Sequence, residues 1–496
     1  MEEDVSSAGG SVSTGSTFKT FASDWSACSN PSFSRFLKVF RGDMELHKNM
    51  LAVLAAIAEV IKAEGGSESS TEYFAALMTT LEGFRLDEDD EEQLVAVLAL
   101  LGMGIKTVPA SVLRLKFNSA SKVFIEILCK YTETDHNIIL RSIRKAAHHA
   151  VSVVLRCSKG DPVKEISSHP AAVATAKFCI QQLEATGALG ASSSTLYILS
   201  LLKGNLHEFP KNYIKQSCEA ILKMMTLGSS LITTNSLQVF YSLFSARPNL
   251  NVMPASLNAQ LINALYDYQP STSDSQTTQA WLLVLQEGFI NLSKLDLSVC
   301  MLNLPRIFTI CSNLWLTNNE GICQSATLTL KSVIDECIAL AMSTLENAQK
   351  HNLIIEKVFT ILQNGLRLQF QHVWKSVLRL LNLMYKVCGK HCSSFLLPYL
   401  KTLAELRDAE ESNYALEIEN VIGSAVYSMG PERVLEVVPL QITLKDKKHE
   451  FKRSWLLPVL KACIQESTLQ CFHDYFMPLA TICRNHSLNC GSSRMK

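Results

Sequence analysis

The stretch that decides the fold is IRKAAHHAVSVVL at residues 143–155. Ile143, Ala147, Ala150 and Val154 recur at spacings of three and four, so they share one face of an α-helix. The small alanines on that face allow a second helix to approach closely. This pattern is typical of the second helix of a HEAT repeat, a two-helix unit that buries its apolar face against the next unit.

Similar segments follow one another along most of the chain, and most have ordinary helix lengths. A two-helix unit recurs about every 40 residues, and we find no βαβ alternation and no alternating strand pattern. We therefore predict an all-α fold, a HEAT/armadillo-like α-solenoid of stacked helix pairs. The predicted helices cover residues 50–61, 73–78, 94–101, 112–131, 143–155, 171–183, 195–202, 213–225, 236–244, 257–266, 277–285, 322–342, 353–366, 373–387, 395–406, 414–429, 455–465 and 469–483.

Composition divides the chain into three predicted parts. Residues 1–30 are rich in Ser, Gly and acidic residues and are expected to be disordered, because they offer few bulky apolar side chains to bury. We assign residues 31–487 to the solenoid and residues 488–496 to a tail. Within the solenoid, Ser69 and Glu72 have the spacing of a capping box and predict a helix start.

The charges of this 496-residue chain balance overall but are unevenly spread. Lys and Arg number 46, as do Asp and Glu, which removes any global electrostatic argument for nucleic-acid or membrane binding. The first 100 residues hold seven basic and seventeen acidic side chains, with the acid concentrated in DEDDEE at residues 87–92. That run predicts either a solvated loop or an acidic docking segment.

Cysteine usage and hydropathy indicate the class of protein. Fifteen cysteines are scattered, many within apolar stretches, which favours a reduced intracellular protein. The uncharged residues 224–246 are too polar for a bilayer-spanning helix and predict two short helices that meet near Gly228. No membrane span is expected.

Motifs for catalysis and for cofactor binding are missing. The chain contains no GxxxxGK[ST], GxGxxG, GxSxG or HExxH. Ser119 and Lys122 have SxxK spacing without a companion motif, so we do not assign them a nucleophilic role. We expect no enzymatic activity, no cofactor and no small-molecule substrate.

Two groups of potential metal ligands also have a structural interpretation. CGKHC at residues 388–392 offers two cysteines and a histidine, but a structural zinc site needs four ligands and no second clustered pair is present. We expect two core-facing cysteines at a helix end. His148 and His149 diverge by about 100° on a helix, so one is expected to be packed and the other exposed.

Two basic groups are candidates for contacts with RNA phosphates. One is a cluster near the C-terminus; its alternative interpretation is a solvated loop. The other is the pair Arg144 and Lys145, which can instead pair with an acidic residue in the adjoining repeat. Aromatic residues do not alternate with basic ones, so any RNA binding would use backbone charge and shape. The seven candidates are Lys445, Lys447, Lys448, Lys452, Arg453, Arg144 and Lys145.

Several stretches together resemble the ribosomal RNA processing 12-like proteins, which are large nucleolar HEAT-repeat factors. The resemblance covers about residues 20–487, and its motifs are specific to that family in combination. The stretches are TEYFAALMTTLE (71–82), IRKAA (143–147), HPAA through AKFCI (169–180), LNAQ through ALYDY (257–268), SMGPE (428–432) with VPL (438–440), and RSWLLPV (453–459).

The resemblance implies a non-enzymatic scaffold in ribosome biogenesis, located in the nucleus and nucleolus. It would act in pre-ribosomal RNA processing and in subunit maturation and export, and would bind pre-ribosomal RNA, assembly factors and nuclear transport machinery. The alternative is a nuclear transport receptor or adaptor of the solenoid type, which would bind cargo and a small GTPase.

Two departures from the family pattern accompany the resemblance. Family chains are much longer and end in a charged tail, whereas residues 489–496 do not resemble the family, so we expect a C-terminally truncated form. The family also carries about one further repeat between Ser142 and Ile143, and its loss would place a seam in the array.

Overall fold

A computed structural model describes residues 45–84, 91–130, 138–157, 170–189, 193–409, 413–442 and 452–484. These residues are almost entirely helical and contain no β-strand, so the predicted all-α fold is confirmed. The chain divides into two compact units, residues 1–227 and 228–496. The predicted disordered residues 1–30 and the tail 488–496 lie outside the described residues, and the division into three parts stays a prediction.

The first unit is a series of helices in which contacts run mainly between helices one or two positions apart. α5 contacts α3, α4 and α7, while α8 contacts α6, α9 and α10. This is the pattern of a stack of helix pairs. Its helices are α3 (Glu45–Ala63), α4 (Ser70–Glu82), α5 (Glu91–Gly104), α6 (Ala110–Lys130), α7 (Ile138–Cys157), α8 (Pro170–Leu189), α9 (Ser193–Asn205) and α10 (Lys211–Met225), with short 3₁₀ turns η1 (Ile105–Thr107) and η2 (Leu206–Glu208).

Helix boundaries in the first unit follow the expected local signals. Ser69 caps α4 and accepts a hydrogen bond from the backbone of Glu72, whose side chain accepts one from the backbone of Ser69, so the predicted capping box is confirmed. α7 runs without a break through Ser142 and Ile143, where a seam was expected. After α10, Gly228 has φ +73°, a left-handed conformation that separates α10 from α11 as predicted.

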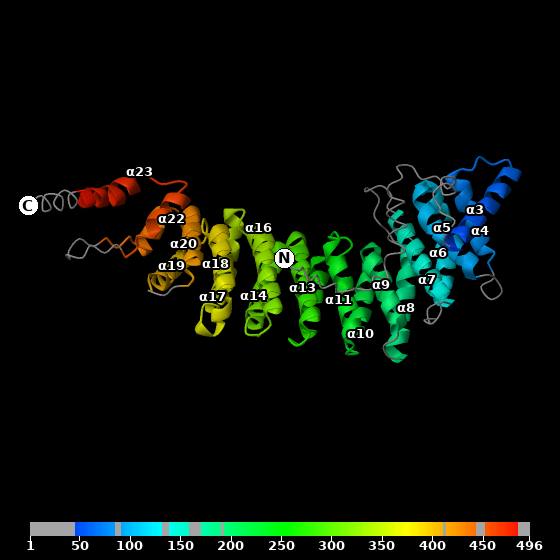
Figure 1. The fold of residues 1–496 in the computed structure, drawn as a ribbon, viewed down its shortest axis with the longest axis horizontal. Coiled ribbons are helices and arrows are strands. Elements are labelled where there is room, and N and C mark those ends of the chain that lie inside the picture. Colours follow the sequence, from blue (N-terminus) through cyan, green and yellow to red (C-terminus); the bar gives the residue numbers. More distant parts are fainter. Residues whose placement is uncertain are drawn as a thin grey trace, which may run out of the picture. The chain divides into compact units, whose positions relative to one another are not determined.

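The second unit contains a longer series of stacked helix pairs (Figure 1). Its helices are α11 (Ser230–Ser245), α12 (Ala255–Asp267), α13 (Ser275–Leu295), α14 (Leu297–Leu314), α15 (Glu320–Val333), α16 (Ala339–Ala341), α17 (Leu345–Asn364), α18 (Trp374–Cys388), α19 (Ser393–Asp408), α20 (Ala415–Met429), α21 (Pro431–Val437), α22 (Leu456–Cys463) and α23 (Leu469–Cys471), with η3 (Ile334–Ile338), η4 (Leu368–Val373) and η5 (Phe472–Phe476).

Two rows of helices make up this second unit. In the first row α11, α13, α15, α18, α20 and α22 contact one another in turn. In the second row α12 contacts α14, and α14 contacts α17. Each helix of the second row also packs on a partner in the first, as α17 does on α18 and α19 on α20. The unit is therefore a HEAT-like α-solenoid.

The sequence separation of residues in polar contact across neighbouring repeats gives the length of the repeat. The hydroxyls of Thr234 and Thr277 lie 3.1 Å apart and 43 positions apart in sequence. Ser424 donates to the side chain of Asn382, 42 positions earlier. In the first unit Asn49 donates to Glu92, 43 positions later. These spacings agree with the predicted period of about 40 residues.

The sequence pattern missed two helices, the short α21 and the long α14. Pro305 lies inside it and removes one backbone donor, which makes the segment look like a connector. α14 also has the length and hydropathy of a membrane-spanning helix, the one such case in the described part of the chain. It packs against α13, α15 and α17, and its buried Met301, Leu304 and Phe308 give it the character of a core helix.

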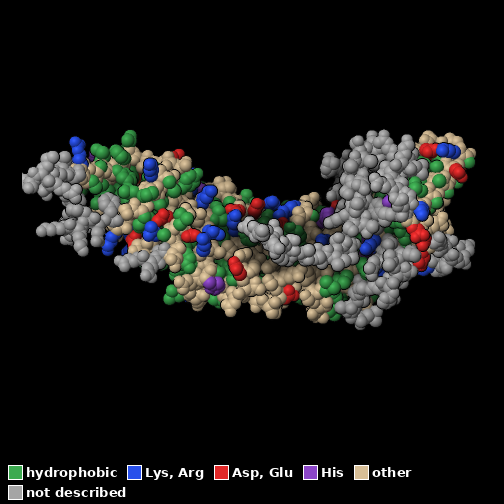
Figure 2. Space-filling model, in the orientation of Figure 1, with side chains coloured by type: hydrophobic (Ala, Val, Ile, Leu, Met, Phe, Trp, Pro, Cys, Tyr) green, Lys and Arg blue, Asp and Glu red, His purple; other side chains and the backbone are tan. Residues whose placement is uncertain are grey.

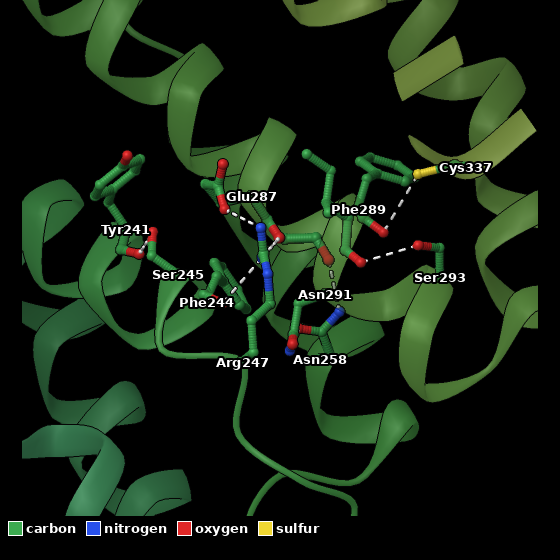
Figure 3. Close-up of polar contacts among 12 residues, drawn as sticks. Tyr241, Phe244, Ser245, Arg247, Asn258, Glu287, Phe289, Asn291, Ser293 and Cys337 are labelled. Atoms are coloured by element: carbon green, nitrogen blue, oxygen red, sulfur yellow. Dashed lines mark hydrogen bonds and ion pairs between the residues drawn. The ribbon is translucent and has the colours of Figure 1, made fainter. Parts of the chain in front are cut away.

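A polar network ties α13 to its neighbours (Figure 3). Arg247, just after α11, forms an ion pair with the carboxylate of Glu287 and donates to its carbonyl oxygen at 3.2 Å. The buried amide of Asn258 on α12 donates to the carbonyl of Gly288 at 2.9 Å. Side chains from the α11–α12 connector and from α12 thus bond the backbone of α13 and stabilise the packing of these helices.

Candidate ligand-binding surface

The predicted basic cluster near the C-terminus is only partly described. Lys445, Lys447 and Lys448 lie outside the described residues, so their role as phosphate contacts stays a prediction. Lys452 is exposed just before α22. Arg453, the next residue, is only 4% exposed.

Arg453 is bonded by the protein itself. Its Nε donates to the carboxylate of Asp408 at 2.8 Å, and its Nη1 donates to the carbonyl of Pro439 at 3.1 Å. The indole of Trp455 donates to the other carboxylate oxygen of Asp408 at 3.0 Å. This arrangement joins the end of α19 to the start of α22, so the guanidinium of Arg453 contributes to packing between repeats.

Arg144 and Lys145 differ in exposure as Arg453 and Lys452 do. Arg144 on α7 is 1% exposed, and its guanidinium lies 3.3 Å from the ring centre of Tyr197 on α9, a cation–π contact between helices. Lys145 is exposed. Of the described candidates, the lysines therefore face solvent and the arginines face the core.

The two adjacent histidines of α7 and the cysteines at the end of α18 lie in structural positions. His148 is mostly buried and His149 is exposed, as expected. Burial, with a smaller contribution from the charge of Arg144, lowers the pKa of His148 to about 4. Cys388 and Cys392 are both buried at the end of α18, as expected for core-facing thiols.

One hollow surface in the second unit was not predicted. It runs across α18, α20 and α22 and comprises two adjoining hollows of about 570 and 230 Å³ that share Asn382, Leu416 and Asn420. We call it the α18–α22 groove. Its lining residues are Lys375, Leu378, Arg379, Asn382 and Lys386 from α18; Leu416, Glu417, Glu419, Asn420, Gly423, Ser424 and Tyr427 from α20; and Pro458, Val459, Ala462 and Cys463 from α22.

A sequence signal for this groove exists. Lys375, Arg379, Asn382 and Lys386 follow one another at spacings of four, three and four, which places them on one face of α18. The opposite face supplies buried side chains such as Leu381. Polar residues on the outer face of a helix usually indicate only solvation, so the pattern becomes informative once α20 is known to lie beside α18.

The charges in the groove are partly neutralised. Lys375 lies 3.2 Å from Glu417, and Arg407 binds Glu419 at 2.7 Å. Desolvation raises the pKa of Glu417, but its hydrogen bond with Lys375 and the nearby positive charges outweigh this, and the net pKa is lowered. Arg379 and Lys386 form no ion pair with any described residue, so the groove keeps a positive character.

Two amide side chains lie on neighbouring helices of the groove. Asn382 accepts a hydrogen bond from Ser424 at 2.6 Å through its oxygen, and its nitrogen donates to no group in the described residues. Asn420 is exposed, with no hydrogen bond from its side chain to the described part of the protein. Such amides can both donate to and accept from a ligand.

This chemistry is suited to noncovalent binding. Among the described residues no group of three His, Cys, Asp or Glu side chains is placed to hold a metal ion. On the face drawn in Figure 2, basic and acidic side chains lie interspersed over the second unit, and hydrophobic side chains gather over its C-terminal helices. Leu469 on α23 and Phe472 on η5 are exposed large apolar side chains.

Comparison with known families gives two matches in the chain. The family described as "Ribosomal RNA-processing protein 12, HEAT repeats" matches residues 316–495. The family described as "RRP12-like, N-terminal HEAT repeats" matches residues 33–143. Both describe the repeat type that the two units display.

Similar proteins carry related names. An "RRP12-like protein" of Gallus gallus is 37% identical over 525 positions, which cover 97% of this chain and 40% of that protein. The "RRP12-like protein" of Homo sapiens is 36% identical over 95% of this chain and 39% of its own length. The "Ribosomal RNA-processing protein 12" of Saccharomyces cerevisiae is 23% identical over 68% of this chain. The chain spans about 40% of the length of the two vertebrate relatives.

Proposed function

The chain belongs to the RRP12-like family of HEAT-repeat proteins, and from that premise we propose that it acts in ribosome biogenesis as a non-enzymatic factor in ribosomal RNA processing. The observation that carries the proposal is similarity at 33–37% identity across nearly the whole chain to three RRP12-like proteins. The fungal relatives are named as ribosomal RNA-processing proteins. The proposed location is the nucleus, and within it the nucleolus.

In this role the chain is a scaffold that binds pre-ribosomal RNA and assembly factors. A stack of helix pairs presents long exposed faces, which suit docking of extended partners. Subunit maturation and export, with contacts to transport machinery, complete the proposed role. Exposed lysines would bind RNA by releasing counterions from phosphates. Lys145 and Lys452 have the exposure that such contacts need, and Lys445, Lys447 and Lys448 are proposed on charge density.

The role in processing can be tested in cells. The tagged chain is crosslinked to RNA, purified under denaturing conditions, and the bound RNA is sequenced. We expect precursor sequences of ribosomal RNA to be enriched over the same purification without crosslinking. Recovery of ribosomal precursors at the level of that control would contradict the proposal.

RNA affinity is tested separately with purified protein. Reversing Lys445, Lys447 and Lys448 to Glu is expected to weaken binding to ribosomal RNA more than reversing Lys145, the exposed member of the second group, because the first group is denser in charge. Filter binding at low and high salt measures both variants. Equal affinities for the parent and both variants would refute this. Binding that instead follows the nucleotide state of a small GTPase would indicate a transport receptor.

A further inference from the structure

We propose that the α18–α22 groove binds an extended peptide segment of a partner protein, in which acidic residues lie among apolar ones. The proposal rests on three properties of the groove: two amide side chains on neighbouring helices, two cations that form no ion pair with a described residue, and an apolar lining. Together these match the backbone, the carboxylates and the apolar side chains of such a segment.

The side-chain amides of Asn382 and Asn420 can form hydrogen bonds with the backbone of a bound peptide. Asn382 and Asn420 stand on adjacent helices and line the same hollow. A side-chain amide can donate to a peptide carbonyl and accept from a peptide N–H, independently of the peptide's sequence. Packed helices lie about 8–10 Å apart. An extended chain advances about 3.3 Å per residue, so the two amides can hold backbone positions roughly three residues apart.

The charges select acidic side chains. Glu417 and Glu419 are already paired with Lys375 and Arg407, whereas Arg379 and Lys386 are not paired with a described carboxylate. A carboxylate of the peptide beside Arg379 or Lys386 would gain charge-assisted hydrogen bonds. RNA fits less well, because it carries a phosphate at every nucleotide and so could not avoid Glu417 and Glu419, whereas a peptide can place apolar residues beside them.

The apolar lining provides the remaining contacts. Leu416 is 66% exposed and Tyr427 is 52% exposed, and Val459 and Pro458 face the same hollow. Exposed large apolar side chains of this kind commonly mark binding grooves. Side chains of an extended peptide alternate in direction, so some can pack on this lining while others reach Arg379 and Lys386.

The proposed peptide site adds the chemistry of a protein partner to the proposed function. It rests on that function only in expecting the partner to be a ribosome assembly factor. A phage-displayed library of random dodecapeptides is panned on the purified full chain. Enriched peptides are then synthesised with a fluorescent label, and their affinities are measured by fluorescence polarisation. We expect enrichment of sequences that combine Asp or Glu with apolar residues.

Two groove variants test the assignment. N420A breaks no hydrogen bond within the described protein, and we expect it to weaken the selected peptides about fivefold through loss of a backbone contact. The double variant R379E/K386E is expected to weaken acidic peptides more than tenfold, with a smaller effect at high salt. N382A is less clean, because it also removes the bond from Ser424.

Matched controls change the same chemistry elsewhere in the second unit. N313A and the double variant K357E/K401E alter exposed residues away from the groove and should leave peptide affinity unchanged.

Cysteine labelling tests the location of the bound peptide. Cys463 lies in the groove and Cys483 outside it, so bound peptide should slow maleimide labelling of Cys463 but not of Cys483.

Three outcomes would overturn the proposal. One is a panning experiment that enriches no peptide over an unrelated protein. Another is a set of selected peptides that bind the groove and control variants equally. The third is an oligouridylate that binds in the groove more tightly than any peptide and loses affinity in R379E/K386E, which would make the occupant RNA. None of these results depends on whether the chain acts in ribosomal RNA processing.

Discussion

Arg453 and Arg379 both lie in the C-terminal repeats of the second unit, yet their environments are opposite. Arg453 is 4% exposed, binds Asp408 and a backbone carbonyl, and joins α19 to α22. Arg379 is exposed on α18 and lines a groove without a carboxylate partner among the described residues. The difference shows that a basic residue of a helical array contributes to packing or to binding according to the helix face on which it lies.

Breaking the buried pair should give the largest effect on stability. R453M keeps most of the side-chain volume but leaves the carbonyl of Pro439 without this donor and Asp408 with only the bond from Trp455. Removing one partner of a buried ion pair costs about 3 kcal/mol, which is the expected loss in the free energy of unfolding. Urea denaturation followed by circular dichroism measures it. The neighbouring exposed variant K452A should unfold like the parent; an equal loss in both would argue against the distinction.

Arg144 offers the same comparison in the first unit. R144M removes the guanidinium from the face of Tyr197 within the packed interface of α7 and α9. A desolvated cation–π contact is worth about 2 kcal/mol, and a loss of about this size is expected. Thermal unfolding of R144M and K145A compares the buried residue with its exposed neighbour. A stable R144M together with loss of RNA binding would instead place Arg144 on the RNA surface.

The pH dependence of stability tests the burial of His148, which lies on the same helix as Arg144. The pKa of His148 is lowered to about 4 in the folded chain from an ordinary value near 6.5. The unfolded chain therefore takes up the proton first, so His148 favours folding above pH 6.5, and this stability is lost as the pH falls toward 4. H148Q should reduce the slope of stability against pH in that window. An unchanged slope would show that His148 is solvated.

The smallest effect on the free energy of unfolding is expected at the solvent-exposed ion pair between Lys375 and Glu417 in the groove. Lys375 binds Glu417 at 3.2 Å, but the lysine side chain is 59% exposed. Solvent screening limits such pairs to about 0.5 kcal/mol, so K375A should hardly change the midpoint of urea denaturation. A loss as large as that of R453M would mean that the groove face is buried against another part of the protein.

The sequence predicts the architecture well because each repeat carries its own local signals. The capping box at Ser69, the left-handed Gly228 and the buried Ile143 and Ala147 all lie where expected. α14 was missed because Pro305 interrupts a pattern that the neighbouring helices nevertheless support.

The candidate site was harder to predict than the fold. The HEAT-like helix pattern selected Arg144, and the basic cluster near the C-terminus selected Arg453. Their burial depends on Tyr197 and Asp408, which are 53 and 45 positions away in the sequence. The α18–α22 groove depends on contact between helices of successive repeats, which a single segment does not reveal. Local spacing therefore predicts helix faces, and only the packed array shows which faces stay open.

The most direct test of this account is hydrogen–deuterium exchange of the full chain with and without purified pre-ribosomal particles. The account predicts slower exchange in segments 375–386, 416–427 and 458–463, which form the groove, and unchanged exchange in 143–155, where Arg144 already packs inside α7. Protection of 143–155 with no change across the groove segments would contradict it.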